Sequence, residues 1–381
     1  MLLFPKHIAF CVLVVVGVIF LPSCLDARRE ISSPDTQSHP LSLRYATHFG
    51  VEETSYGYLA TVYAGGSDQQ VTFRYALVRG DSAQVPDDAC RIKIPVERLG
   101  TNSGTLFGFL ELLGVMDKMV ATCDAKFIFS DEIRGKVSRG DIISLGSSFD
   151  INGERLLFAH PDVLFLSDLR DDPHANVCPV VHNFEWKESS ALARTEWIKF
   201  ISLFFDRYAM ADSIFQTIEQ RYVDLKEMVD TVQTRPTLFS AGSYGDTWYM
   251  TGGEGFMSKL YQDAGGNYLL ADTMVPTVTC GTEWLLAHYS EADFWMNCGT
   301  VRLEDLDPRL SQMKSYKNGN LFHFQKREKT TDGLHITDFY ESAVARPDVV
   351  LADLISVLHP EVMPEHETVY LGRCVKSGEG R

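Results

Sequence analysis

The stretch WIKFISLFFDRYAMADSIFQTIEQRYVDLKEMV, residues 197–229, decides the fold of this chain. Its apolar residues recur at helical spacing, in the series Trp197, Ile201, Phe204, Tyr208, Ala211, Phe215, Ile218, Tyr222, Leu225 and Val229. The spacing predicts one long helix or two shorter ones, which would cover about 50 Å if continuous. We expect a break near Asp206, because aspartate is a good helix N-cap. The segment therefore reads as a helical connection.

Strand and helix patterns alternate on both sides of this connection. Before it, short apolar runs at 92–96, 119–122 and 163–167 predict strands, and 105–113 and 153–159 predict helices. After it, strands at 237–240, 292–297 and 319–324 accompany helices at 255–263 and 349–359. From 44 to 79 the alternation of apolar and polar residues around Gly65-Gly66 predicts an antiparallel hairpin or meander. The fold class that follows is α/β, with two lobes of mainly parallel sheet, a long helix between them and an N-terminal hairpin elaboration.

The length of the chain also favours two lobes. Without a leader of 24 residues, about 357 of the 381 residues remain. A single hydrophobic core usually supports fewer residues than this. We place the N-terminal lobe at 41–189, the connecting helical segment at 190–232 and the C-terminal lobe at 233–375. A helical connection resists bending, so we expect the lobes to close only slightly.

The N-terminus has the pattern of a bacterial lipoprotein precursor. An apolar run from Ile8 to Leu21 follows Lys6 and ends at Leu21-Pro22-Ser23-Cys24. This predicts a signal peptide at 1–24, a diacylglyceryl group on Cys24 and a flexible polar tether at 25–40. An ordinary cleaved signal or an uncleaved anchor helix is the alternative. We expect a lipid-anchored protein on the periplasmic or cell-surface side of a bacterial membrane.

Composition limits the partners of the chain. A formal charge of −16 argues against nucleic acid, which needs a basic face. Six cysteines lie outside the signal, and none forms a CxxC motif. We expect Cys280 to pair with Cys298, and in second place Cys90 with Cys123, because both pairs flank strand-like runs; free buried thiols are the alternative.

Three phrases carry a resemblance to a known family. They are ERLLFAHPDVL at 154–164, GVMDKMV at 114–120 and RPDVVL at 346–351. Their order and spacing resemble the helical-backbone class of periplasmic substrate-binding proteins, which deliver iron-siderophores, haem or cobalamin to ABC importers. The resemblance covers roughly residues 90 to 365 and implies a ligand cleft between the lobes, a permease partner, a monomer and no cofactor.

The resemblance also suggests where the permease docks. Glu154 and Glu254 stand at the starts of helices, one in each lobe, and a glutamate on each lobe contacts permease arginines in the resembled family. Carboxylates are also stabilised at helix N-termini by the macrodipole, by about 0.3–1 kcal/mol, which is the structural alternative.

The loops after strands are the candidate ligand site. In the first lobe we select Ser147, Ser148 and Phe149, and near the connection Trp186 with Glu185. In the second lobe we select Tyr244, Trp248 and Tyr249, because glycines mark 242–253 as a loop with too many large aromatics to be exposed without a purpose. Trp284 is selected from a separate loop of the same lobe. Each of these aromatics could instead pack the lobe beneath it.

The ligand itself is left open by the sequence. An iron complex of siderophore type is the first expectation, with cobalamin or haem as the alternative. Related haem binders place a tyrosine where this chain has Ser147-Ser148, although Tyr244, Tyr249 or His288 could substitute. The segment from His359 to His366 contains four possible metal ligands, but its two prolines prevent a helical metal site.

An enzyme is the alternative from another class. Neither GxSxG nor HExxH occurs, so no catalytic residue is predicted. A surface-anchored enzyme acting on tetrapyrroles would need catalytic residues dispersed along the sequence.

Overall fold

The computed structural model describes residues 38–65, 72–80, 83–169, 176–299 and 303–374, which belong to one compact unit, Gln37–Arg381. The predicted signal peptide, Cys24 and the tether up to residue 37 lie outside the described residues. Among the described residues, no helix combines the length and apolar character needed to cross a membrane.

The first sheet of the described residues has five strands in the order β1-β2-β3-β4-β5. Its strands are β1 (His39–Pro40), β2 (Phe49–Thr54), β3 (Gly57–Tyr63), β4 (Thr72–Val78) and β5 (Cys90–Lys93). The first four are antiparallel, which confirms the predicted meander. β5 runs parallel to β4. The strand predicted at 92–96 therefore completes this sheet rather than starting the alternating unit.

A parallel sheet in the order β12-β11-β6-β7-β8 follows. Its strands are β6 (Leu99–Thr101), β7 (Met119–Thr122), β8 (Ile143–Ser144), β11 (Val163–Leu166) and β12 (Val180–His182). The helices between them are α1 (Leu106–Leu112), α2 (Asp131–Arg139) and α3 (Gly153–Ala159), with 3-10 turns η1 (Met116–Lys118) and η2 (Ala125–Phe127) and a small hairpin of β9 (Gly146–Ser147) and β10 (Asp150–Ile151). Strand–helix–strand crossovers thus build the first half, as predicted.

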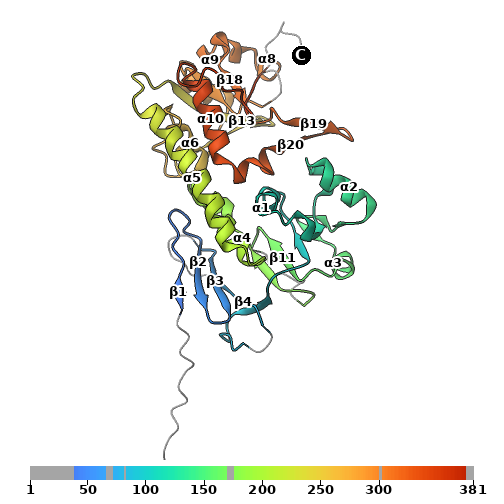
Figure 1. Cartoon of the computed structure of the whole chain (residues 1–381). Coiled ribbons are helices and arrows are strands. Elements are labelled where there is room, and N and C mark those ends of the chain that lie inside the picture. Colours follow the sequence, from blue (N-terminus) through green and yellow to red (C-terminus); the bar gives the residue numbers. More distant parts are fainter. Residues whose placement is uncertain (1–37, 66–71, 81–82, 170–175, 300–302, 375–381) are drawn as a thin grey trace, which may run out of the picture. The chain divides into compact units, whose positions relative to one another are not determined.

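Two consecutive helices make the connection. They are α4 (Ala191–Leu203), preceded by the 3-10 turn η3 (Glu185–Lys187), and α5 (Tyr208–Asp230). All thirteen residues of α4 are buried. Figure 1 shows α5 running from the first sheet to α10, and its 23 residues cover about 34 Å.

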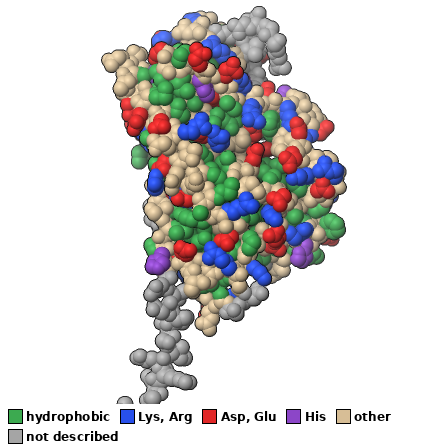
Figure 2. Space-filling view, viewed as in Figure 1, with side chains coloured by type: hydrophobic (Ala, Val, Ile, Leu, Met, Phe, Trp, Pro, Cys, Tyr) green, Lys and Arg blue, Asp and Glu red, His purple; other side chains and the backbone are tan. Residues whose placement is uncertain are grey.

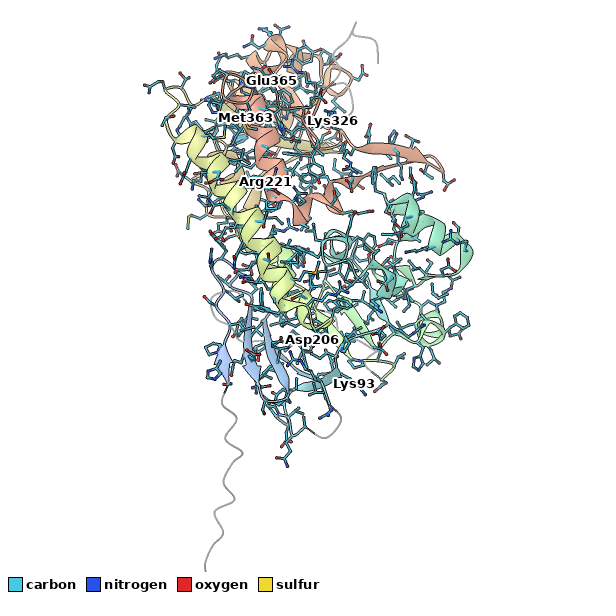
Figure 3. The ribbon with its side chains drawn as sticks, in the orientation of Figure 1. Lys93, Asp206, Arg221, Lys326, Met363 and Glu365 are labelled. Atoms are coloured by element: carbon cyan, nitrogen blue, oxygen red, sulfur yellow. A yellow bond between two sulfur atoms is a disulfide. The ribbon has the colours of Figure 1, made fainter. Side chains whose placement is uncertain are left out.

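The break between α4 and α5 falls where it was predicted, but Asp206 is not the cap of α5. Its φ is 54°, a left-handed conformation, and its carboxylate accepts from Arg79 Nη2 at 2.7 Å. Arg207 occupies the N-cap position instead. Figure 3 shows Asp206 at this corner. The aspartate thus ties the helix break to the end of β4.

The second half contains a mixed sheet in the order β16-β14-β13-β17-β18-β21, with β15 also paired to β13. Its strands are β13 (Thr237–Tyr244), β14 (Thr247–Thr251), β15 (Asn267–Tyr268), β16 (Thr277–Cys280), β17 (Phe294–Met296), β18 (Leu321–His323) and β21 (Gly372–Arg373). Its helices are α6 (Phe256–Asp263), α7 (Thr282–Tyr289), α8 (Leu303–Leu306), α9 (Lys314–Asn318) and α10 (Pro347–Leu358), with 3-10 turns η4 (Pro308–Gln312), η5 (Asp338–Tyr340) and η6 (Ala343–Ala345). A separate hairpin is formed by β19 (Glu328–Thr331) and β20 (Leu334–Thr337).

The segment from 242 to 253 corrects one expectation. It was predicted as a loop, but β13 continues to Tyr244 and turns at Gly245, whose φ is 58°, into the antiparallel strand β14. The glycine therefore serves a tight hairpin turn, and the aromatics around it alternate between the two faces of a strand pair.

Two large hydrophobic clusters form the cores, one in each half. The first contains Phe49, Trp197 and Phe215, and the second contains Tyr222, Val229 and Trp295. α5 therefore contributes its beginning to one core and its end to the other. Arg221, between these parts, forms an ion pair with the buried Asp348 of α10 at 3.1 Å (Figure 3). The predicted fold class is confirmed, whereas the boundaries at 41–189, 190–232 and 233–375 stay a prediction.

Aromatic packing joins the first sheet to α4. The ring of Phe49 in β2 lies 4.8 Å from Trp197 and 5.5 Å from Phe200, measured between ring centroids. These two rings come about 150 residues later in the chain. The apolar face of the N-terminal sheet is thus covered by the connecting helix.

Buried carboxylates hold the segment between β1 and β2 against the connecting helices. Glu196, fully buried in α4, accepts from the backbone N–H groups of Arg44, Tyr45 and Ala46 at 2.8–3.1 Å. Glu188 accepts from the N–H groups of Thr47 and His48 and from the Trp197 indole. Burial alone would raise the pKa of Glu188, but its hydrogen bonds with His48, Trp197 and Thr47 lower it overall.

The disulfide expectations were wrong. Cys298 pairs with Cys374, across a sequence separation of 76. Cys280 and Cys90 carry free thiols, so neither Cys280–Cys298 nor Cys90–Cys123 forms. The spacing argument failed because β21, near the end of the described residues, pairs with β18. This pairing brings Cys374, the residue after β21, close to Cys298.

Charged side chains of both signs are interspersed on the face seen in Figure 2. The face shows no separate basic patch.

Candidate ligand cleft

A cavity of about 290 Å³, here called the apolar chamber, lies between the two halves. The first half contributes Thr105 at the start of α1, and Trp186 follows from η3. The remaining walls come from α4, α6 and the chain from η5 to α10: Ala191, Arg194, Phe256, Met257, Leu260, Phe339, Tyr340, Ala343, Val344, Pro347 and Val350. Almost every lining side chain is apolar.

A second cavity of about 650 Å³ adjoins the first, and we call it the polar chamber because it carries most of the polar groups of the cleft, although the larger part of its lining is apolar. The two chambers share Trp186, Phe256 and Met257. The other lining residues of the polar chamber are Lys187, Glu188, Tyr249, Met250, Thr251, Glu254, Gly255, Pro276, Thr277 and Asn297. Together the chambers form one cleft with an apolar part and a polar part.

Trp186 is placed at the junction of the chambers by its backbone turn and one hydrogen bond. The indole Nε1 donates to the carbonyl of Ser167, at the end of β11, over 2.9 Å. Half of the residue (51%) remains exposed. Lys187 Nζ donates to the carbonyl of Ala64 at 2.6 Å and lies 5.5 Å from the centre of the Trp186 ring, and burial lowers the pKa of Lys187. The ammonium group therefore lies over the indole, and the part of Trp186 that stays exposed lines the cleft.

A buried ion pair stands behind the apolar chamber. Arg194 Nη2 lies 3.6 Å from Glu185 Oε1, and the guanidinium carbon lies 4.3 Å from the centre of the Phe256 ring. Arg194 is 8% exposed and Glu185 1%. Burial raises the pKa of Glu185 and lowers the pKa of Arg194, and the attraction between them opposes both shifts. The arginine therefore already has a carboxylate and an aromatic face as partners.

Contacts across the halves lie on the other side of the apolar chamber. Glu341, which is 7% exposed, accepts from the backbone N–H groups of Phe129 and Ser130, just before α2. Burial raises the pKa of Glu341 to about 7, against the effect of these two hydrogen bonds. Lys329 of the β19–β20 hairpin pairs with Asp131 at 2.5 Å, and Figure 1 shows this hairpin reaching toward α2. Residues of the second half thus form hydrogen bonds and an ion pair with the start of α2.

Helix α1 also touches the second half closely. A Cβ on Gly108 would come within 2.6 Å of the carbonyl oxygen of Glu341 and 3.2 Å of Ala345. Only a glycine allows α1 to approach the 341–345 segment at this distance.

Three of the predicted site residues meet in the cleft. Trp186 lines both chambers, and Tyr249 and Glu254 line the polar chamber. Glu254, selected for permease docking, therefore stands at the ligand cleft as well as just before the N-cap of α6.

Other predicted ligand residues do not line either chamber. Ser147, Ser148 and Phe149 lie at the β9–β10 hairpin, with Phe149 85% exposed. Tyr244 and Trp284 are exposed outside the chambers, and the Trp284 ring stacks on His288 at 3.9 Å.

The structure moves Trp248 from the predicted ligand surface into the core. It is 2% exposed, packs edge-on against Trp295 at 5.3 Å and donates from Nε1 to Thr282 Oγ1 at 3.0 Å. The alternation of the β13–β14 hairpin explains this, because Tyr249, the next residue, points the other way. A loop prediction could not separate these two neighbours.

Glu154 is exposed at the start of α3, and its docking role stays a prediction. It is exposed in the first turn of α3, which Asn152 caps by accepting from Arg155 N at 2.9 Å. Two apolar side chains of this helix, Leu157 and Phe158, are 62% and 78% exposed.

Sequence reasoning missed several lining residues. Phe256, Met257 and Leu260 belong to a helix that was predicted, but periodicity shows an apolar face without showing what covers it. Phe339 and Tyr340 follow the β19–β20 hairpin and carry no helical or strand pattern. Tyr340 is a large aromatic residue that stays exposed, which is typical of a binding surface. Its exposure becomes known only from the fold.

Residues 102–328 match the model of a family described as periplasmic binding protein. The match spans more than half of the chain, so the chain belongs to the family of periplasmic binding proteins. The predicted resemblance is thereby confirmed, and the family and its solved structures are binding proteins rather than enzymes.

Similar proteins include an uncharacterized lipoprotein of Methanocaldococcus jannaschii, 22% identical over 73% of this chain and 68% of its own length. A periplasmic haem-binding protein from Pseudomonas aeruginosa superposes with a TM-score of 0.54 at 15% identity, covering 74% of this chain and 100% of the other. A siderophore-binding protein, bound to two molecules of acinetobactin and ferric iron, gives 0.52 at 13% identity and covers 86% and 100%. At these identities the structures show a shared fold.

Proposed function

We propose that the chain is the substrate-binding lipoprotein of an ABC importer that captures an iron complex of siderophore type and delivers it to the permease. The observation that carries the proposal is the two-chamber cleft between the halves, with Trp186 at the junction. A cleft between two lobes is a common place for a ligand. Membership in the family of periplasmic binding proteins supports the capture role.

The proposed ligand contacts are the aromatic residues of the cleft. Trp186 and Tyr249 offer flat apolar faces with polar edges, which suit a large chelate. Haem or cobalamin is the alternative ligand. Of the three residues suggested as axial haem ligands, Tyr249 lines a chamber, whereas Tyr244 and His288 do not.

Attachment to the membrane through Cys24 remains part of the proposal. The support is the sequence pattern that ends at Cys24 and the lipoprotein names of two relatives. The anchor would keep the binding protein near its permease at high effective concentration. Labelling of cells with a radioactive fatty acid tests this, since Cys24→Ala should abolish incorporation of the label.

Permease docking is proposed through Glu154 and Glu254. Glu154 is exposed on α3 beside Leu157 and Phe158, which would add apolar contact area around a charge pair. Glu254 stands at the edge of the cleft, so docking there would bring the permease beside the bound ligand.

Tryptophan fluorescence tests ligand capture. The native protein is titrated with haem, cyanocobalamin and ferric desferrioxamine B, and one of them should quench with a submicromolar Kd. Trp186→Leu should weaken that ligand at least about tenfold, because stacking area is lost. Trp284→Leu is the matched control, an exposed indole outside both chambers, and should leave the Kd unchanged. The proposal fails if no compound binds or if both variants weaken binding equally.

A further inference from the structure

The apolar chamber exposes far fewer polar groups than the polar chamber, whose lining is mixed. Eleven of its thirteen lining residues are apolar or aromatic, and the other two are Thr105 and Arg194. The lining residues come from four stretches of the chain, at Thr105, 186–194, 256–260 and 339–350, so the apolar wall is assembled by the tertiary fold. A wall of this kind gains free energy when it covers apolar ligand surface.

In the described part of the chain, the one cation that lines the apolar chamber, Arg194, is balanced by a buried carboxylate. Its guanidinium faces Glu185 at 3.6 Å and the Phe256 ring at 4.3 Å. Its buried Nε has no hydrogen-bond partner among the described residues and is an unused donor, but the charge of the guanidinium is balanced by Glu185. A carboxylate that entered would lose its water and meet no net positive charge, which is costly.

The polar chamber offers several hydrogen-bonding groups and one lysine, Lys187. Thr251, Thr277 and Asn297 supply hydroxyl and amide groups, Tyr249 supplies a phenol and Glu254 an exposed carboxylate. Because Trp186, Phe256 and Met257 border both chambers, one molecule can extend from one into the other.

We propose that the ligand is amphiphilic: an uncharged apolar group fills the apolar chamber while the polar, metal-binding part of the same molecule lies in the polar chamber. This inference rests on the proposed function and narrows it to ligands that carry such a group. Trp186 and Phe256 contact the region where the two parts of the ligand join.

Three benzene derivatives of similar shape test the arrangement in the native protein. Para-xylene has a methyl group at both ends, para-toluate replaces one methyl by a carboxylate, and terephthalate replaces both. Para-xylene and para-toluate should bind, the latter with its carboxylate toward the polar chamber. Terephthalate should bind at least about tenfold more weakly than para-toluate, since one carboxylate must enter the apolar chamber. Ligand-observed NMR measures the three Kd values.

A pair of variants places the binding in the chamber. Val344→Phe adds bulk to the apolar chamber and should abolish the binding of para-xylene and para-toluate. Thr277→Phe adds the same side chain to the polar chamber and should leave para-xylene binding unchanged. Equal affinity for terephthalate and para-toluate, or no binding of para-xylene and para-toluate, would overturn the inference.

The same variants separate this inference from the proposed function. Haem, cyanocobalamin or ferric desferrioxamine B, whichever binds the native protein, should bind Val344→Phe at least about tenfold more weakly, because burial of its apolar part is lost. If Val344→Phe binds it as tightly as the native protein does, the chelate-binding function stands and the amphiphilic ligand is excluded. If none of the three compounds binds but para-xylene does, the proposed function fails instead.

Discussion

Arg194 and Glu185 show how a single residue can be misread from sequence. Trp186 and Glu185 were selected together as candidate ligand-site residues near the connection. The structure places Trp186 in the cleft, but it buries Glu185 as the partner of an arginine that was not selected. The sequence predicted that this segment lies near the cleft. The direction of each side chain depends on the η3 turn, which the sequence pattern does not show.

The Arg194–Glu185 pair should matter more when one partner is removed than when both are. Arg194→Leu leaves a buried carboxylate without its cation and should lower the free energy of unfolding by about 3 kcal/mol. The double variant Glu185→Gln with Arg194→Leu should recover most of that loss, since no charge remains buried. Urea unfolding measures both, and equal losses in the single and double variants would contradict the pair as the cause.

Glu196 should be a second sensitive residue. Its carboxylate accepts three backbone N–H groups from residues 44–46, so Glu196→Gln should lower the free energy of unfolding by about 2 kcal/mol. Glu227→Gln, an exposed position on α5, is the control and should change it by less than about 0.5 kcal/mol. A similar loss in both variants would indicate a general effect of removing charge.

At the scale of elements, much of the fold was predictable because local patterns follow local rules. The break between α4 and α5, the strand β7 and the helix α3 were all expected. The hairpin at Gly245 was not, because a glycine turn inside a strand pair resembles a loop until its partner strand is known. The disulfide from Cys298 to Cys374 depended in the same way on a pairing that no local pattern contains.

The contact between α1 and the 341–345 segment should depend on Gly108. Gly108→Ala places a methyl group within 2.6 Å of a backbone oxygen, so α1 must move away from the second half. Hydrogen exchange in residues 338–345 should become faster. Gly135→Ala is the matched control in α2, where the added methyl group meets only the end of the Arg139 side chain at 3.3 Å and should slightly stabilise the helix. Unchanged exchange in Gly108→Ala would show that the contact carries no constraint.

For the molecule as a whole, Glu341 should make the contact between the halves depend on pH. Burial raises its pKa to about 7, and separation of the halves would return that pKa toward its ordinary value. The protonated form is therefore favoured in the closed arrangement, so the contribution of Glu341 to closure is present at pH 5 and is lost as the pH rises through 7. Energy transfer between dyes on α2 and α9 should show more separation at pH 8 than at pH 5.

A variant tests whether Glu341 is the responsible group. Glu341→Gln cannot ionise, so the separation between the dyes should no longer change between pH 5 and pH 8. Glu361→Gln, at an exposed position, should keep the pH response of the native protein. A response that persists in Glu341→Gln would assign it to other groups.

Docking is also a property of the whole molecule. Glu154→Arg reverses a charge far from both chambers and should abolish uptake of the bound chelate by cells while leaving its Kd unchanged. Glu254→Arg should impair uptake and also change the Kd, because Glu254 lines the polar chamber. A changed Kd in Glu154→Arg would count against its docking role.

The packing of Phe49 on Trp197 and Phe200 has a consequence for the order in which the protein can be made. While the chain emerges from the ribosome, the apolar face of the first sheet has nothing to cover it until about 150 further residues have been translated. Contacts of such separation form late, because a long stretch of chain must first be brought together. The first sheet therefore cannot complete its folding during the first half of synthesis. A chaperone that shields β2 and β3 would be needed for that interval.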